Sequence, residues 1–435
     1  MTTFNPLKEK GIPLDKQLRT WHDIVKRPYK REEADCYTRT RQILMNGIEI
    51  ETWGFKHHLL RTIDCAETKK LVADMRRIED TQQTTVNWLS PPNQSVLDTT
   101  LGYEQVAVDL TAWLAQNEPD SYVKETYDYG LLEDFDHLYR YSQFAYLIEG
   151  VNPDDILHYQ TDVMFARPTQ YHHNANRMRI RNAYDKNTAS PQTKANILTL
   201  MAGEQQTHNY YAEHGFMYGS DELKRLYAEI CDVEEEHVTM YETLIDPSET
   251  LYEKLLLREF MEVCCYHNCY KDEVGPKLKL IWEEFLAMEI EHLQIAAKIL
   301  EKKEGRDAEE IIGTKVYDTC HFESQKKYVT KIIESEIDKR LDGKPERGYC
   351  KLSELPDTWC SYEVQDKVSA DGAPSEESVR MSIEAIDSDI SSADNSLMNK
   401  RCELLSRALD MKSQAPNTVS VEEYEMLTQN KIFAE

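Results

Sequence analysis

The sequence has 435 residues, of which 40% are hydrophobic, so two or three packed domains are expected. Its 78 acidic and 51 basic residues give a net charge of −27, which argues against binding to nucleic acids and to anionic membrane surfaces. Such an acidic excess usually serves solubility, but it can also concentrate carboxylates that hold cations. Without a signal-peptide core, a long apolar run or a CxxC pair, the chain is expected to be cytoplasmic, with reduced cysteines.

The first part of the chain is predicted to form helices. Periodic apolar residues predict helices over residues 32–63, 66–89, 95–116 and 121–149. Pro91 and Pro92 separate the second helix from the third, and Gly150 ends the fourth. A less regular segment follows and carries a basic island around His172 and Arg179. We expect this island to form salt bridges with the bundles; a binding site for an anion or a partner is the alternative.

A second set of helices follows, with well-marked ends. It is predicted over residues 196–215, 221–245, 250–271 and 277–303. Thr250 and Glu253 form a capping-box pair, Pro276 stands at a first helical position, and Gly305 follows the last periodic residue. A further helix is predicted at 307–340, then a linker at 343–375 and a polar helical region at 376–412 within a partly mobile tail. No β-strand is predicted.

The spacing of acidic residues and histidines reveals a repeat. Only two Glu-x-x-His matches occur, Glu234–His237 and Glu289–His292. On a helix, residues three apart lie on the same face. Glu204 and Glu259 each lie 30 residues before the glutamate of one of these pairs, so two helical hairpins repeat at an interval of 55 residues.

The same pattern recurs 155 residues upstream. The four glutamates align, in chain order, with Glu49, Glu79, Glu104 and Asp134. His292 aligns with His137, whereas His237 aligns with Gln82. We interpret this as a tandem duplication of a four-helix unit. The predicted organisation is an N-terminal bundle at 30–150, a connector at 151–195, a C-terminal bundle at 196–305 and a helical extension at 306–435.

The ionisable residues of this repeat interrupt apolar stripes. Along one helix, Leu223 and Ile230 lead to Glu234, which occupies a core position, whereas Glu235 and Glu236 are expected at the surface. An unpaired carboxylate in a core is costly and normally takes up a proton or finds a partner. Several carboxylates and imidazoles converging in one core therefore predict a pair of bound cations.

This constellation resembles the ferritin-like di-iron carboxylate superfamily, in which two Glu and two Glu-x-x-His project into a four-helix bundle core. The resemblance covers residues 196–305. It implies that the metal ligands are Glu204, Glu234, His237, Glu259, Glu289 and His292. By the same resemblance, Glu204 and Glu259 are terminal ligands. Glu234 and Glu289 bridge the metals, and each metal takes one histidine.

Glu262 extends the third helix of this unit to a Glu-x-x-Glu pattern. It is similar to the extra carboxylate of rubrerythrins, although the four-cysteine iron module of those proteins is absent. A position outside the ligand set, or a plain surface charge, is the alternative. Residues 306–435 have no counterpart in the resemblance.

The N-terminal unit departs from the pattern at Gln82 and Asp134. It could be a degenerate packing unit without a site. It could also hold a modified or mononuclear site, made by Glu49, Glu79, Glu104, Asp134 and His137.

The sequence thus predicts an all-α protein with two tandem ferritin-like four-helix bundles and a helical C-terminal extension. The resemblance implies two iron ions, although manganese or a mixed pair would use the same ligands. The expected function is a di-metal oxidoreductase acting on O2, peroxide or an unidentified substrate. An iron-binding protein that oxidises Fe(II), and a non-catalytic scaffold with a vestigial site, are the alternatives. No electron donor is indicated, and a homodimer is compatible with the sequence.

Overall fold

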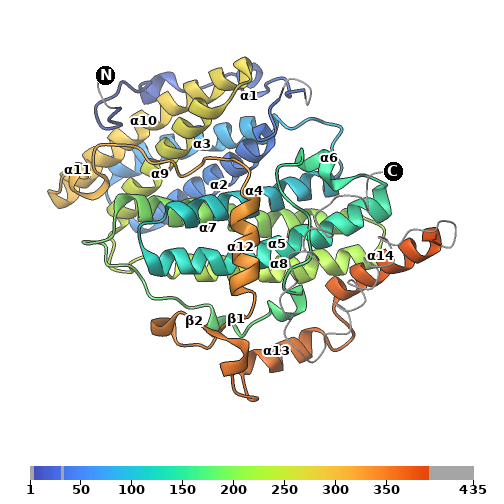
Figure 1. The fold of residues 1–435 in the computed structure, drawn as a ribbon. Coiled ribbons are helices and arrows are strands. Elements are labelled where there is room, and N and C mark those ends of the chain that lie inside the picture. Colours follow the sequence, from blue (N-terminus) through green and yellow to red (C-terminus); the bar gives the residue numbers. More distant parts are fainter. Residues whose placement is uncertain (1–3, 31–33, 391–435) are drawn as a thin grey trace.

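The fold was analysed in a computed structural model that describes residues 4–30 and 34–390 (Figure 1). Long helical hairpins form its centre. Their helices are α2 (Thr38–Thr62), α3 (Ala66–Asn87), α4 (Val96–Asn117), α5 (Ser121–Glu149), α7 (Pro191–His214), α8 (Asp221–Glu242), α9 (Leu251–Asp272) and α10 (Pro276–Glu304). The predicted all-α class is confirmed, and each predicted helix of the two sets corresponds to one of these elements.

Helix ends lie where the capping signals place them. The Thr250 side chain accepts a hydrogen bond from the Glu253 backbone N–H and the Glu253 side chain accepts one in return, so the predicted capping box opens α9. Pro276 is the first residue of α10. Gly150 and Gly305 end α5 and α10 with φ of 64° and 65°, a left-handed conformation that glycine adopts without strain.

The hairpins assemble in an order that differs from the predicted tandem bundles. Helices α2 and α3 pack with α9 and α10 to form bundle I, and α4 and α5 pack with α7 and α8 to form bundle II. Each bundle therefore takes one hairpin from residues 30–150 and one from residues 196–305. In Figure 1, bundle I lies at the upper left and bundle II below it.

The close contact between α2 and α7 joins the two bundles. Gly47 of α2 lies at this contact, where an added Cβ would stand 2.9 Å from the carbonyl oxygen of Ala202. The absence of a side chain lets the two backbones approach. Because α2 also packs on α4 and α9, the first helix of each hairpin faces the middle of the molecule.

Shorter elements surround the bundles. They are α1 (Trp21–Ile24), α6 (Pro153–Leu157), α11 (Ala308–Ile312), α12 (Lys326–Glu336), β1 (Lys339–Leu341), β2 (Tyr349–Lys351), α13 (Cys360–Val368) and α14 (Pro374–Ile390). The single helix predicted at 307–340 is thus interrupted between α11 and α12. The antiparallel pair of β1 and β2 is an element that the sequence did not predict, because three-residue strands are too short to show alternation.

Other expectations concern the tail, the cysteines and the membrane. Of the helical region predicted at 376–412, α14 covers the part up to Ile390; the remainder, with the tail expected to be mobile, lies outside the described residues. The cysteines within the described ranges are free thiols. In that same part of the chain, no helix combines the length and apolar composition of a membrane span.

Candidate metal centres

Two clusters of ionisable side chains lie in the bundle cores. Site I, in bundle I, consists of Glu49, Lys56, Glu79, Gln82, Glu259, Glu262, Glu289 and His292. Site II, in bundle II, consists of Glu104, Asp134, His137, Glu204, Glu234 and His237. Each of these side chains is at most 1% exposed. The prediction that the acidic residues of the repeat occupy core positions agrees with this burial.

The structure divides the residues that were predicted to share one site. Glu204, Glu234 and His237 lie in site II, together with Asp134 from the N-terminal half. The remaining predicted ligands lie in site I, namely Glu259, Glu262, Glu289 and His292. The N-terminal residues divide in the same way, with Glu49 and Glu79 in site I and Glu104, Asp134 and His137 in site II.

Site II offers two groups of ligand atoms that share Glu234. One is formed by Asp134, Glu204, Glu234 and His237, whose ligand atoms lie within 4.8 Å of one another; the other joins Glu234 to Glu104 and His137. His237 Nδ1 lies 3.2 Å from Asp134 Oδ1 and 3.2 Å from Glu234 Oε2. The two groups therefore share the Glu234 carboxylate, and each offers ligand atoms of the kind that hold a cation.

A buried ion-pair network fixes the orientation of His237. Its Nε2 donates to Glu133 Oε2 at 2.8 Å, so Nδ1 faces site II. Arg167 and Arg179 donate to the two oxygens of Glu133 at 2.6 and 2.8 Å. Burial would raise the pKa of Glu133, but these guanidinium groups hold it well below the usual range. Such a partner on the outer nitrogen is a regular feature of histidines that bind metals.

Arg179 also pairs with Glu236, which is 4% exposed. The basic segment is therefore bonded to the bundles, as the salt-bridge interpretation predicted. Glu236 was expected at the surface but is buried, because its carboxylate pairs with the buried Arg179 guanidinium. Its neighbour Glu235 is exposed, as expected.

A hydrogen-bonded chain through His172 fixes the orientation of His137. Burial lowers the pKa of His172 far below the usual value, so this residue is neutral. His172 Nε2 donates to the Arg167 carbonyl at 2.8 Å, and its Nδ1 accepts from His137 Nε2 at 3.2 Å. His137 Nδ1 then lies 3.0 Å from Glu234 Oε1. A proton on Nδ1, or a metal ion beside both atoms, would stabilise this approach.

Several carboxylate oxygens in site II lack hydrogen-bond partners. They are both oxygens of Asp134, both of Glu204, and one each of Glu104 and Glu234. The other oxygen of Glu104 accepts from the Tyr211 hydroxyl. Burial, together with the neighbouring carboxylates, raises the pKa of Glu104 and of Glu204 well above the usual range. Buried polar atoms are normally paired, so this set calls for a cationic partner.

Site I offers one such ligand group. It is formed by Glu79, Glu259, Glu289 and His292. His292 Nδ1 lies 2.9 Å from Glu289 Oε2, and its Nε2 donates to Gln17 Oε1 at 2.8 Å. Gln17 belongs to the N-terminal segment, in which Ile12 donates from its backbone to the Ala287 carbonyl of α10 at 2.7 Å. This segment thus orients His292 as Glu133 orients the imidazole in site II.

Lys56 and Gln82 distinguish site I. The Lys56 ammonium, fully buried, pairs with Glu79 and lies 2.6 Å from Glu259 Oε1. Gln82 Nε2 donates to Glu289 Oε1 at 2.7 Å. Glu262 is fully buried and both of its oxygens lack partners, so it is not the surface charge that was one alternative.

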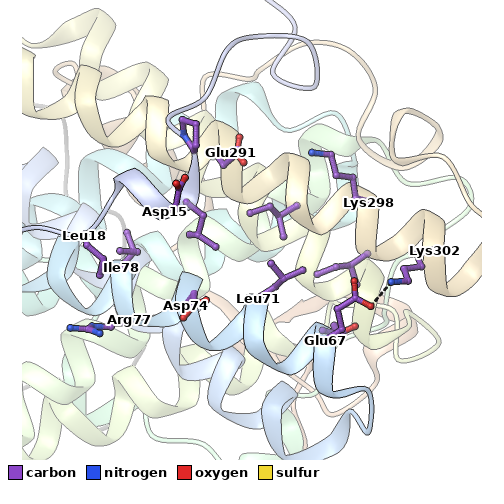
Figure 2. A pocket seen from close by; sticks show the side chains of 15 residues that line it. Asp15, Leu18, Glu67, Leu71, Asp74, Arg77, Ile78, Glu291, Lys298 and Lys302 are labelled. Atoms are coloured by element: carbon purple, nitrogen blue, oxygen red, sulfur yellow. Dashed lines mark hydrogen bonds and ion pairs between the residues drawn. The ribbon is translucent and has the colours of Figure 1, made fainter.

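A pocket of about 670 Å³ lies between α3, α10 and the N-terminal segment (Figure 2). Leu71 and Ile78 contribute apolar surface, and charged side chains from both helices surround it. Ile78 immediately precedes Glu79, and Glu291 immediately precedes His292. The pocket therefore borders the outer faces of the helices that carry site I.

Comparisons with protein-family models, with curated proteins and with solved structures find no match to this chain. Sequence reasoning missed Glu133, Lys56 and Gln17, which orient or pair with the clustered groups. A usable signal existed for Lys56, because it lies seven residues after Glu49 and so shares its helix face.

Proposed function

We propose that site II binds two divalent metal ions, with iron as the physiological metal, and that the protein is an oxidoreductase acting on O2 or peroxide. The observation that carries the proposal is the set of buried, unpartnered carboxylate oxygens converging from four helices beside two oriented imidazoles. The resemblance of this ligand set to ferritin-like di-iron carboxylate proteins supports iron and oxygen chemistry.

The residues of site II would divide the binding between two positions. Asp134, Glu204 and His237 would hold one ion, Glu104 and His137 would hold the other, and Glu234 would be available to both. Bound as a pair, the ions would supply two electrons to one oxygen molecule or peroxide.

The surrounding chain would keep the ligands in place. Glu133 and His172 hold the outer nitrogens of the two imidazoles, so both Nδ1 atoms face the ions. Tyr211 fixes one oxygen of Glu104 and leaves the other free to bind. Burial of the whole cluster keeps bulk solvent away from the reacting groups.

The buried charges favour a metal site over a non-catalytic scaffold. Carboxylates in a protein interior cost several kcal/mol each, at order of magnitude, unless a partner compensates them. A scaffold would be more stable with apolar residues at these positions. A bound cation would explain why buried carboxylates are retained with several oxygens that lack hydrogen-bond partners.

The experiment measures metal content and oxygen consumption after anaerobic loading with Fe(II). Glu234→Gln, which weakens the ligand shared by both positions, should remove about two ions per chain and abolish consumption of O2 or peroxide with a reductant. Glu235→Gln, on the exposed face of the same helix, is the matched control and should behave as wild type.

Three results are decisive. Unchanged metal content in the folded Glu234→Gln protein would refute the proposed site. Metal binding without any consumption of O2 or peroxide would refute the redox role. Oxidation of Fe(II) that stops after a single turnover, even with a reductant present, would replace the oxidoreductase with the metal-handling alternative.

A further inference from the structure

The two sites correspond position by position at the 55-residue interval of the hairpins. Adding 55 to the numbers of three site I residues on α2 and α3 gives residues of site II: Glu49, Glu79 and Gln82 correspond to Glu104, Asp134 and His137. Subtracting 55 from three site I residues on α9 and α10 gives the rest: Glu259, Glu289 and His292 correspond to Glu204, Glu234 and His237. The carboxylate is kept at every one of these acidic positions.

Three buried positions break the correspondence. Lys56 stands where site II has Thr111, Gln82 where it has His137, and Glu262 where it has Thr207. Site I has therefore gained a fixed positive charge and a further carboxylate, and has lost one imidazole. These changes affect the number of cations that each site can hold.

The Lys56 ammonium occupies the place of a cation. It pairs with Glu79 and Glu259. Their counterparts in site II, Asp134 and Glu204, have no ammonium or guanidinium partner among the described residues; the His237 Nδ1 atom lies 3.2 and 3.7 Å from their oxygens. Thr111, the counterpart of the lysine, is uncharged and its hydroxyl also lacks a partner. In site I the Lys56 ammonium supplies a positive charge that, in site II, a bound metal ion would have to supply.

Gln82 replaces a histidine, so site I lacks the second group of metal ligands that His137 completes in site II. In site II the group around His137 is completed by the imidazole nitrogen that faces Glu234. In site I the amide of Gln82 donates a hydrogen bond to Glu289 instead. An N–H group that points at a carboxylate cannot bind a metal through that atom. This matches the single ligand group that the geometry provides in site I.

We propose that site I binds one divalent cation, held by Glu79, Glu259, Glu289 and His292, and that the Lys56 ammonium serves as its second cation. The three carboxylates of this group are then neutralised by one divalent ion and one ammonium, and the other two carboxylates of site I, Glu49 and Glu262, lie outside the group. In site II, four carboxylates are neutralised by two divalent ions. The proposal builds on the two-ion capacity proposed for site II, and the full chain should hold about three ions.

The test is a metal count after anaerobic loading with Mn²⁺, combined with electron paramagnetic resonance. Wild type should bind about three ions per chain and show the signal of an isolated Mn²⁺ beside that of a coupled pair. Glu234→Gln should lose the coupled pair and keep the isolated ion. His292→Ala should lose only the isolated ion.

A double variant tests the cause of the difference. Lys56→Thr with Gln82→His restores the residues found in site II and should raise the count to about four, with a second coupled pair. Lys302→Thr, which removes an exposed lysine, should leave the count unchanged. Circular dichroism checks that each variant is folded.

The outcomes separate the two proposals. A wild-type count of about four, or a folded double variant that stays at about three, overturns the assignment of site I, and so does a His292→Ala protein that keeps the isolated signal. A Glu234→Gln protein that keeps its coupled pair overturns site II instead. The wild-type count and its spectrum decide the question even if the double variant fails to fold.

Discussion

Glu133 offers a test of how the second nitrogen of a histidine controls metal binding. Arg167, Arg179 and His237 donate to the Glu133 carboxylate. In Glu133→Gln, one carboxylate oxygen is replaced by an NH2 group, which cannot accept these bonds and must face a guanidinium or the His237 N–H. Loss of such a partner typically weakens metal affinity 10–100-fold, equivalent to about 1.4–2.7 kcal/mol. We expect a loss of this size at the His237 position of site II.

The same substitution should destabilise the fold. Leaving buried charges unpaired typically costs roughly 3–5 kcal/mol. Arg179 keeps Glu236, and Arg167 keeps a hydrogen bond to the Lys339 carbonyl at 2.7 Å, so we expect the lower part of that range.

The assay combines anaerobic metal titration by calorimetry with denaturant unfolding of the metal-free protein. Glu235→Gln is the control for loss of a nearby negative charge, and the isolated site in bundle I should keep its affinity. Unchanged affinity at site II in a folded Glu133→Gln protein would show that orientation of His237 by Glu133 does not matter for binding.

The remaining predictions concern packing and protonation. Gly47→Ala should cost roughly 1–3 kcal/mol in unfolding free energy, because its Cβ would meet α7. Gly54→Ala on the same helix, with no atom within 4 Å of its Cβ, should stabilise by roughly 0.5–1 kcal/mol; the reverse order in denaturant titrations would contradict this packing. Tyr211→Phe should cost roughly 1–3 kcal/mol by leaving a Glu104 oxygen without its donor, and a neutral result would refute the bond's importance. Burial raises the pKa of Glu79 from 4.5 to about 7, so the native state holds this proton more tightly than the unfolded chain. The contribution of Glu79 to the unfolding free energy of the metal-free protein should therefore fall as the pH rises from 4.5 through about 7. Denaturant unfolding that shows no such fall across this pH range would contradict the prediction.

The sequence predicts the helices and their capped ends well, because those features are local. Thr250 with Glu253, and the glycines after α5 and α10, act through backbone groups a few residues away. The ionisable residues were also predictable as buried, since they interrupt apolar stripes. Glu236 was not, because its burial depends on Arg179, which comes from a segment 57 residues earlier in the chain.

The spacing of acidic residues in the sequence could not predict which hairpins pair to form a bundle. Hairpins that repeat at 55 and 155 residues present equivalent acidic faces, so a bundle made from neighbouring hairpins and one made from distant hairpins satisfy the pattern equally. The choice depends on contacts between helices, such as the approach of α2 to α7 at Gly47, which no periodicity reveals.

That choice changes the meaning of the two departures from the repeat. In a tandem arrangement, Gln82 and Asp134 both weaken one N-terminal site. In the interleaved arrangement they lie in different bundles. Asp134 keeps a carboxylate and completes site II together with two histidines, whereas Gln82 lies beside Lys56 and Glu262 in site I. The interleaved arrangement thus gives one cluster with two histidines and one with a buried ammonium, and each half of the chain contributes residues to both.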